Sequence, residues 1–171
     1  MCERTEQFIA AARLYCEWEE SNYRPDLKST RQALELITEL YLCGVRLSGK
    51  TKSFKYTKTP VLFKLRRGDN IKPRKGKLPF DHYSEIFDPI PVQAEEPVTG
   101  SLRDDLSSIY CDVKKGFILL DAGYEQDAVK QWIINMQIHW GGHATSAIRA
   151  LHCYLSQKDG FYGWGMKTSR V

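Results

Sequence analysis

The chain has 171 residues, of which 42% are hydrophobic, and it carries a net charge of +4. This length and composition predict one compact domain over residues 1–171 with its own hydrophobic core. No charge-free run approaches the ~20 residues that a bilayer-spanning helix needs, and the first residues lack the pattern of a secretory signal. We therefore expect no membrane partner.

The positive charge is concentrated in one segment. Residues 50–77 contain eleven Lys or Arg and one acid, Asp69, which gives a local charge of +10. The remaining residues must then carry −6. The sequence describes a mildly acidic body with a basic insertion over residues 50–78.

The five cysteines predict a reducing environment. They are odd in number and widely spaced, and they include no C-x-x-C pair: Cys2, Cys16, Cys43, Cys111 and Cys153. Such a pattern suits free thiols better than a disulfide framework or a structural zinc site. We expect a cytoplasmic protein.

Hydrophobic spacing predicts an all-α fold, a bundle of about four main helices. The first helix covers residues 3–20, and the second follows Pro25 and stops near Gly49. Ser101 resembles a helix cap and predicts the start of the third helix, while the fourth runs from about 125 to 155.

The segment between the second and third helices is predicted to be irregular. Strand-like alternation around Pro60 allows a small hairpin inside the basic insertion. Residues 79–97 are interrupted by prolines and predict a strap with one helical turn at 83–87. Residues 156–171 are predicted to form an aromatic C-terminal tail.

Two histidines four residues apart form the most informative pattern. His139 and His143 would lie on one side of the fourth helix, about 5–6 Å apart. A short turn near Gly123 makes the third and fourth helices antiparallel neighbours. Counting residues back from this turn places Asp105 near both histidines and Asp112 one to two turns further along, near Trp132 and Asn135.

Three interpretations of this cluster compete. The first is a partly buried Asp–His hydrogen bond that orients two helices, because an unpaired buried polar group costs about 1–3 kcal/mol. The second is a metal-dependent hydrolase, in which His139, His143 and Asp105 bind zinc, iron or manganese and Asp112 or water completes the shell. The third is acid–base catalysis without metal. We favour the first, which needs no cofactor and assigns no catalytic residue.

The neighbouring residues favour close packing. Trp132 and Trp140 are expected in the core, and the adjacent Gly141 and Gly142 would let another backbone approach the helix. Glycine inside a helix costs about 1 kcal/mol relative to alanine, so a packing role is the simplest reason for two of them. We therefore expect Gly142→Leu to destabilise the fold by about 1–3 kcal/mol through overpacking.

Several motifs in order resemble one known family. They are Tyr83-x-x-x-Phe-Asp-Pro, then Glu95-Glu-Pro-Val-x-Gly-Ser-Leu-x-Asp-Asp-Leu, and His139-Trp-Gly-x-His-Ala. The chain resembles, over about residues 79–155, a bacterial family of small helical proteins carried as a domain of unknown function. The resemblance implies an all-helical domain and no established reaction. That family often has an acid where this chain has Ser108, which weakens the metal hypothesis if that acid is a ligand.

The basic insertion suggests a second class of function. Its cations alternate with aromatic residues, a composition that can hold phosphates and stack bases. No nucleic-acid motif accompanies it, so a solvated surface is the simpler interpretation and an acidic protein fits as well. The candidate contact residues are Lys55, Lys58, Lys64, Arg66, Arg67, Arg74 and Lys75.

Together these patterns predict a non-catalytic binding or adaptor module whose partner is another protein. The alternatives are the metal-dependent hydrolase and a nucleic-acid or acidic-partner binder, including a toxin-immunity protein, acting through residues 50–77. The oligomeric state, the substrate and the exposure of the Asp–His cluster stay open.

Overall fold

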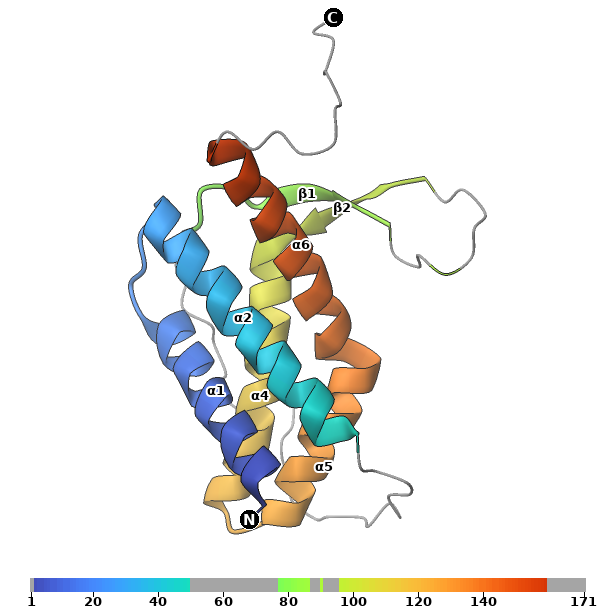
Figure 1. Cartoon of the computed structure of the whole chain (residues 1–171). Coiled ribbons are helices and arrows are strands. Elements are labelled where there is room, and N and C mark those ends of the chain that lie inside the picture. Colours follow the sequence, from blue (N-terminus) through green and yellow to red (C-terminus); the bar gives the residue numbers. More distant parts are fainter. Residues whose placement is uncertain (1, 50–76, 87–89, 91–95, 160–171) are drawn as a thin grey trace, which may run out of the picture.

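Helices and one short β-hairpin make up the described part of the chain, residues 2–49, 77–86, 90 and 96–159 of a computed structural model (Figure 1). The elements in chain order are α1 (Glu3–Glu20), α2 (Leu27–Ser48), β1 (His82–Glu85), β2 (Val98–Ser101), α4 (Leu102–Asp121), α5 (Glu125–Asn135), a five-residue π-helical turn η1 (Met136–Trp140), and α6 (Gly141–Lys158). The mostly helical fold class is confirmed. None of the described helices has the length and apolarity that crossing a bilayer requires.

The helices begin where local capping chemistry places them. The Asp26 side chain accepts a hydrogen bond from the Ser29 backbone N–H at 2.7 Å and starts α2. The Ser101 hydroxyl accepts one from the Asp104 backbone N–H at 3.2 Å and starts α4. Both caps satisfy backbone donors that have no partner inside the helix.

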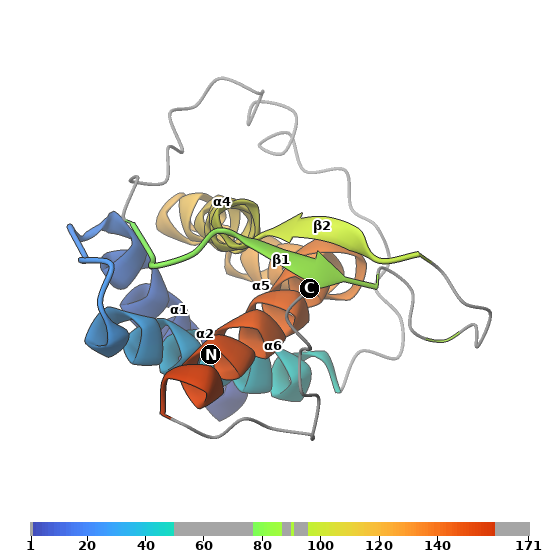
Figure 2. The same ribbon diagram turned by 90° about the horizontal axis from the view of Figure 1, so that it is seen from above.

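The bundle closes around two fully buried tryptophans. Helix α2 packs against α1 and α6, and α4 packs against α5 and α6 (Figures 1 and 2). Trp132 donates to the Val113 carbonyl at 2.9 Å, and Trp140 donates to the Trp132 carbonyl at 3.2 Å. The Phe8 ring of α1 lies 5.1 Å from the Trp132 ring and 6.2 Å from the Trp140 ring. Both indole N–H groups are therefore satisfied inside the core, as buried polar groups require.

A glycine lets α5 approach α4 closely. The indole of Trp132 lies where a Cβ on Gly116 would be, so any larger residue at 116 overlaps the ring. This contact explains how so large a side chain fits between two antiparallel neighbours.

The segment before α4 forms an antiparallel hairpin, with Tyr83 opposite Gly100 and Glu85 opposite Val98. The helical turn expected at 83–87 is therefore wrong where the structure describes it, since 82–85 are a strand. The hairpin expected around Pro60 and the tail from 160 onward lie outside the described residues. Local patterning missed the strands because each is four residues long and is stabilised by a partner about fifteen residues away.

Asp81 attaches the hairpin to the start of α4. Its backbone carbonyl accepts from the Leu102 N–H at 2.8 Å. Its carboxylate accepts from the Arg103 N–H at 2.9 Å and from the Ser101 hydroxyl at 3.0 Å. The first turn of α4 thus carries the hairpin with it.

The predicted fourth helix is interrupted by the π turn η1. Gly141 donates its backbone N–H to the Met136 carbonyl, five residues earlier. A Cβ on Gly141 would overlap that same carbonyl oxygen, whereas a Cβ on Gly142 would meet open space. The overpacking expected at Gly142 is therefore wrong, and Gly141 is the glycine that the backbone requires. Such π turns occur often at functional sites.

The two glycines make a matched pair of substitutions. Gly141→Ala should lower the free energy of unfolding by about 1–3 kcal/mol, because its methyl group collides with the Met136 carbonyl. Gly142→Ala should leave stability unchanged or raise it by up to about 1 kcal/mol, because alanine favours a helix. Urea denaturation of both variants measures this. Equal effects at the two positions would contradict the role assigned to Gly141.

Candidate functional site

Two Asp–His pairs join α4 to the helices that follow. His143 Nδ1 lies 2.8 Å from Asp105 Oδ1, and His139 Nδ1 lies 2.7 Å from Asp112 Oδ2. The carboxylates are seven residues apart on α4 and the imidazoles four residues apart on η1 and α6. The two imidazole rings lie edge to face, with their centroids 4.9 Å apart.

Each buried carboxylate has a second donor on its other oxygen. The Tyr83 hydroxyl donates to Asp105 Oδ2 at 2.5 Å, and Lys115 Nζ lies 2.8 Å from Asp112 Oδ1. The Asp side chains are 7% and 3% exposed. Buried carboxylates need such partners, and here all four oxygens have one.

Gly100 allows Tyr83 to reach Asp105. The phenol ring crosses β2 where a Cβ on Gly100 would lie. Burial first, and then the hydrogen bond to Asp105, raise the pKa of Tyr83 well above its usual range, so the hydroxyl stays protonated and donates. The hairpin therefore contributes directly to the Asp–His cluster.

The carboxylates fix the histidine tautomers. An ionised carboxylate only accepts, so each Nδ1 carries its proton and donates it. The Nε2 atoms are left to accept when the rings are neutral. The hydrogen bond to Asp105 raises the pKa of His143, burial of the ring opposes it, and the charges of Asp105, Asp104 and Asp112 add to the rise.

The pairing differs in two respects from the sequence expectation. Asp112 was expected near Trp132 and Asn135 but bonds to His139, and Asp105 was expected near both histidines but bonds only to His143 of the two. The expectation counted 100° per residue through one continuous α-helix. The wider π turn advances each residue by a smaller angle and so rotates His139 toward Asp112.

His139, His143 and Asp105 line an open cleft, so the cluster is not a closed seam. The volume of the cleft is about 620 Å³, and it lies between the inner face of the hairpin, the start of α4, and η1 with α6. His139 is 51% exposed, whereas the His143 side chain is 24% exposed. The lining also includes Tyr83, Glu85, Val98, Asp104, Gln137, Ile138 and Ser146.

Tyr83, Glu85 and Asp104 are site residues that residue-by-residue reasoning missed. Tyr83 and Asp104 occur in the sequence motifs described above, which were the available signal. For Glu85 the sequence contained no such signal, because Glu85 enters the cleft through the pairing of β1 with β2. In contrast, all seven basic residues proposed to contact an anionic partner lie outside the described residues, so that hypothesis stays a prediction.

The ligand set expected for a metal is not assembled in the described part of the chain, where no three His, Cys, Asp or Glu side chains are grouped to hold an ion. Both oxygens of Asp105 already accept from His143 and Tyr83. Asp105 and Asp112 therefore lie behind the imidazoles, as groups that orient them.

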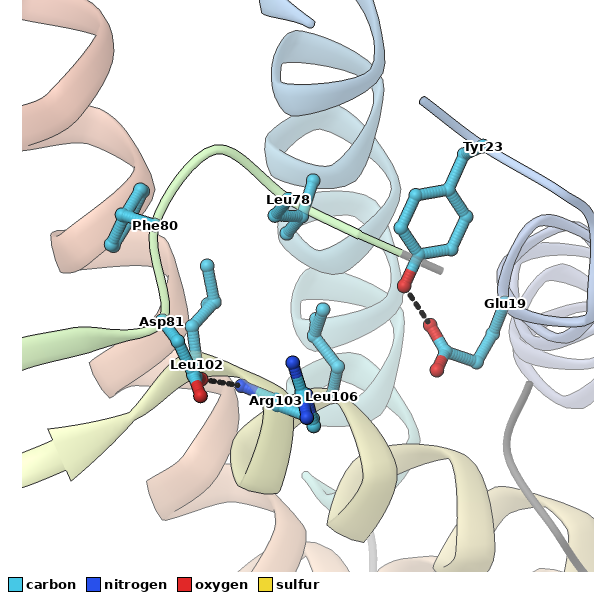
Figure 3. Close-up of a pocket in the computed structure, with 8 residues that line it drawn as sticks. All are labelled: Glu19, Tyr23, Leu78, Phe80, Asp81, Leu102, Arg103 and Leu106. Carbon is cyan, nitrogen blue, oxygen red and sulfur yellow. Dashed lines mark hydrogen bonds between the residues drawn. The ribbon is translucent and has the colours of Figure 1, made fainter. Parts of the chain in front are cut away.

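A second, smaller cavity is also lined by residues from the start of α4 (Figure 3). Its volume is about 40 Å³, and the carboxyl of Glu19 points toward it, near Leu78 and Leu106. The Tyr23 hydroxyl lies 3.3 Å from the Glu19 carboxylate. Burial raises the pKa of Glu19 to about 7, and the hydrogen bond from Tyr23 only partly opposes this.

The sequence matches the family described as Domain of unknown function (DUF5063) over residues 2–157. The chain belongs to this family. The match includes the N-terminal helices α1 and α2 as well as residues 79–155. No curated protein and no solved structure matches the chain. Because the DUF5063 family is described as a domain of unknown function, membership in it assigns no function to this chain. A function must be inferred from the geometry of the Asp–His cluster.

The buried Glu19 predicts a dependence of stability on pH. Since the pKa of Glu19 in the folded state is raised from 4.5 to about 7, the folded state binds the carboxyl proton more tightly than the unfolded state does. Stability should therefore fall as pH rises from about 4.5 to about 7, by on the order of 3 kcal/mol. Glu19→Gln should match the natural protein near pH 4.5 and exceed it by this amount at pH 8, as measured by urea denaturation. The exposed Glu17→Gln is the control, and equal pH profiles for all three proteins would contradict the assignment.

Proposed function

We propose that this protein is a binding module whose recognition site is the cleft beside the Asp–His pairs. One observation carries the proposal: two buried carboxylates orient two imidazoles at the wall of an open cleft of about 620 Å³. A volume of this size is typical of sites that bind small molecules or single side chains. The ligand contacts His139 and His143 at Nε2.

A purely structural role of the two Asp–His pairs explains their position less well than ligand recognition does. Asp–His bonds do link α4 to η1 and α6, which orients the helices. However, His139 is half exposed, whereas a group that only connects two helices gains most when it is excluded from water. Exposure of the ring edge is what recognition of a ligand requires.

The geometry supports binding more directly than catalysis. Ser146 lies one turn after His143 and lines the same cleft. Among the described residues, its hydroxyl makes no hydrogen bond with His143, so the base–nucleophile contact of a hydrolase is missing. The proposal therefore assigns no catalytic residue.

A metal centre is a second candidate, favoured by the orientation of the rings. Histidines that bind metals almost always donate their other ring N–H to a carboxylate or another acceptor, as both do here. Two imidazoles that share a tetrahedral zinc at about 2.0 Å place their centroids roughly 5 Å apart. The observed separation is 4.9 Å. In such a metal centre, water and the bound substrate would supply the remaining ligands of the metal.

The binding proposal is tested by histidine NMR. Blocked tripeptides of the form Ac-Leu-X-Leu-NH2, with X acidic, neutral or basic, are titrated into the protein. At least one peptide should shift the ring protons of His139 and His143. His82 and His152 are exposed elsewhere and serve as internal controls. If no peptide moves the two cleft histidines, or if all four move alike, the proposal fails.

The metal candidate is tested by calorimetric titration of tag-free protein with Zn²⁺ and Mn²⁺. His139→Ala and His143→Ala should abolish binding, and Asp105→Asn should weaken it by about 10–100-fold because it loosens the orientation of His143. His152→Ala should bind as the natural protein does. Binding that survives His143→Ala would exclude this centre.

A further inference from the structure

The chemistry of the cleft lining indicates what it binds. We infer that the cleft receives a lysine or arginine side chain from a partner protein, with apolar residues beside it. This inference rests on the proposed binding function of the cleft. It adds the chemical class of the ligand and the residues that select it.

The charge of the lining favours a cation. Three carboxylates line the cleft, those of Glu85, Asp104 and Asp105, and no described Lys or Arg does. Asp105 is committed to His143 and Tyr83. Asp104 is exposed, and within the described residues its carboxylate acts on His143 through its charge rather than through a hydrogen bond. An ammonium or guanidinium group in the cleft would satisfy it.

The hydrogen-bonding pattern points the same way. With Nδ1 donating to aspartate, an imidazole in its neutral form presents Nε2 as an acceptor, and for His143 this form requires a pH above its raised pKa. Together with Glu85 and Asp104, the cleft therefore offers mainly acceptors. Lysine and arginine are the side chains that carry several donors and no acceptor, so they complement this set. A phosphate or carboxylate would instead meet like charge.

The walls of the cleft suit the rest of such a segment. Ile138 on η1 is 75% exposed and Val98 on β2 is 46% exposed, and both residues line the cleft from different elements. Apolar side chains flanking the cation would cover them, because exposed apolar groups beside a polar site are typical of interfaces. The phenol ring of Tyr83 offers a surface for the methylene stem of the basic side chain.

The size of the cleft suits a full side chain better than a bare ion. About 620 Å³ holds a full side chain with room for its neighbours. The hairpin supplies Glu85 and Val98, α4 supplies Asp104, and η1 supplies Ile138. A ligand must therefore reach three elements at once, as a side chain on a peptide backbone can.

The experiment compares affinities within the tripeptide set by NMR and calorimetry. Peptides with X as Arg or Lys should bind at least about tenfold more tightly than the Gln peptide, equivalent to about 1.4 kcal/mol. Glu85→Gln and Asp104→Asn should each reduce this preference severalfold, and Ile138→Ser should weaken all peptides. Glu35→Gln, an exposed acid on α2 outside the cleft, is the matched control and should change nothing.

The alternatives give different results. If acidic or neutral peptides bind best at the cleft histidines, the cleft is a binding site but the inferred ligand is wrong. If Ac-Arg-NH2 alone binds as tightly as the tripeptide, the ligand is a small organic cation and the peptide partner is overturned. If Glu35→Gln weakens binding as much as Asp104→Asn, the preference is general electrostatics and the inference fails. Thermal melting of each variant separates loss of binding from loss of fold.

Discussion

The carboxylate of Asp105 holds the functional end of the molecule together. Each of its oxygens accepts one hydrogen bond, from His143 on α6 and from Tyr83 on the hairpin, while the residue itself belongs to the first turn of α4. Removing either donor would leave a buried charge half satisfied, which is expensive in a medium of low polarity. Three elements that are distant in sequence therefore share one constraint. Asp112, seven residues further along α4, likewise has one donor on each oxygen, from His139 and from Lys115.

The hydrogen bonds of the Asp–His cluster can form only because two positions, 100 and 141, are glycines without a Cβ. Gly100 gives the Tyr83 ring a path across β2, and Gly141 accommodates the carbonyl that the π turn directs at it. The π turn in turn rotates His139 toward Asp112. Beneath it, Trp132 and Trp140 anchor η1 in the core through their indole N–H bonds. The site is thus built from rigid helices, and the packing that fixes the fold also orients the imidazoles.

The sequence predicted those parts of the structure that depend on local interactions. Helix limits followed from caps such as Ser101 and from hydrophobic spacing, and the helical class was confirmed. Helix phase brought Asp105 and His143 together, because a short turn between antiparallel helices leaves few registers. The exchange of partners at Asp112 could not be foreseen, since nothing in residues 136–140 shows that the helix widens there. Glu85 and Tyr83 entered the site through strand pairing, which is decided by contacts far along the chain.

The hydrogen bond between Tyr83 and Asp105 makes the proton affinity of His143 depend on the position of the Tyr83 ring. The hairpin, α4 and α6 meet at this carboxylate, so a ligand that displaces the Tyr83 ring also withdraws one of its two donors. The carboxylate would then attract the proton of His143 more strongly and make that imidazole more basic. A ligand that moved the Tyr83 ring would therefore also change the proton affinity of His143, through a single oxygen atom of Asp105.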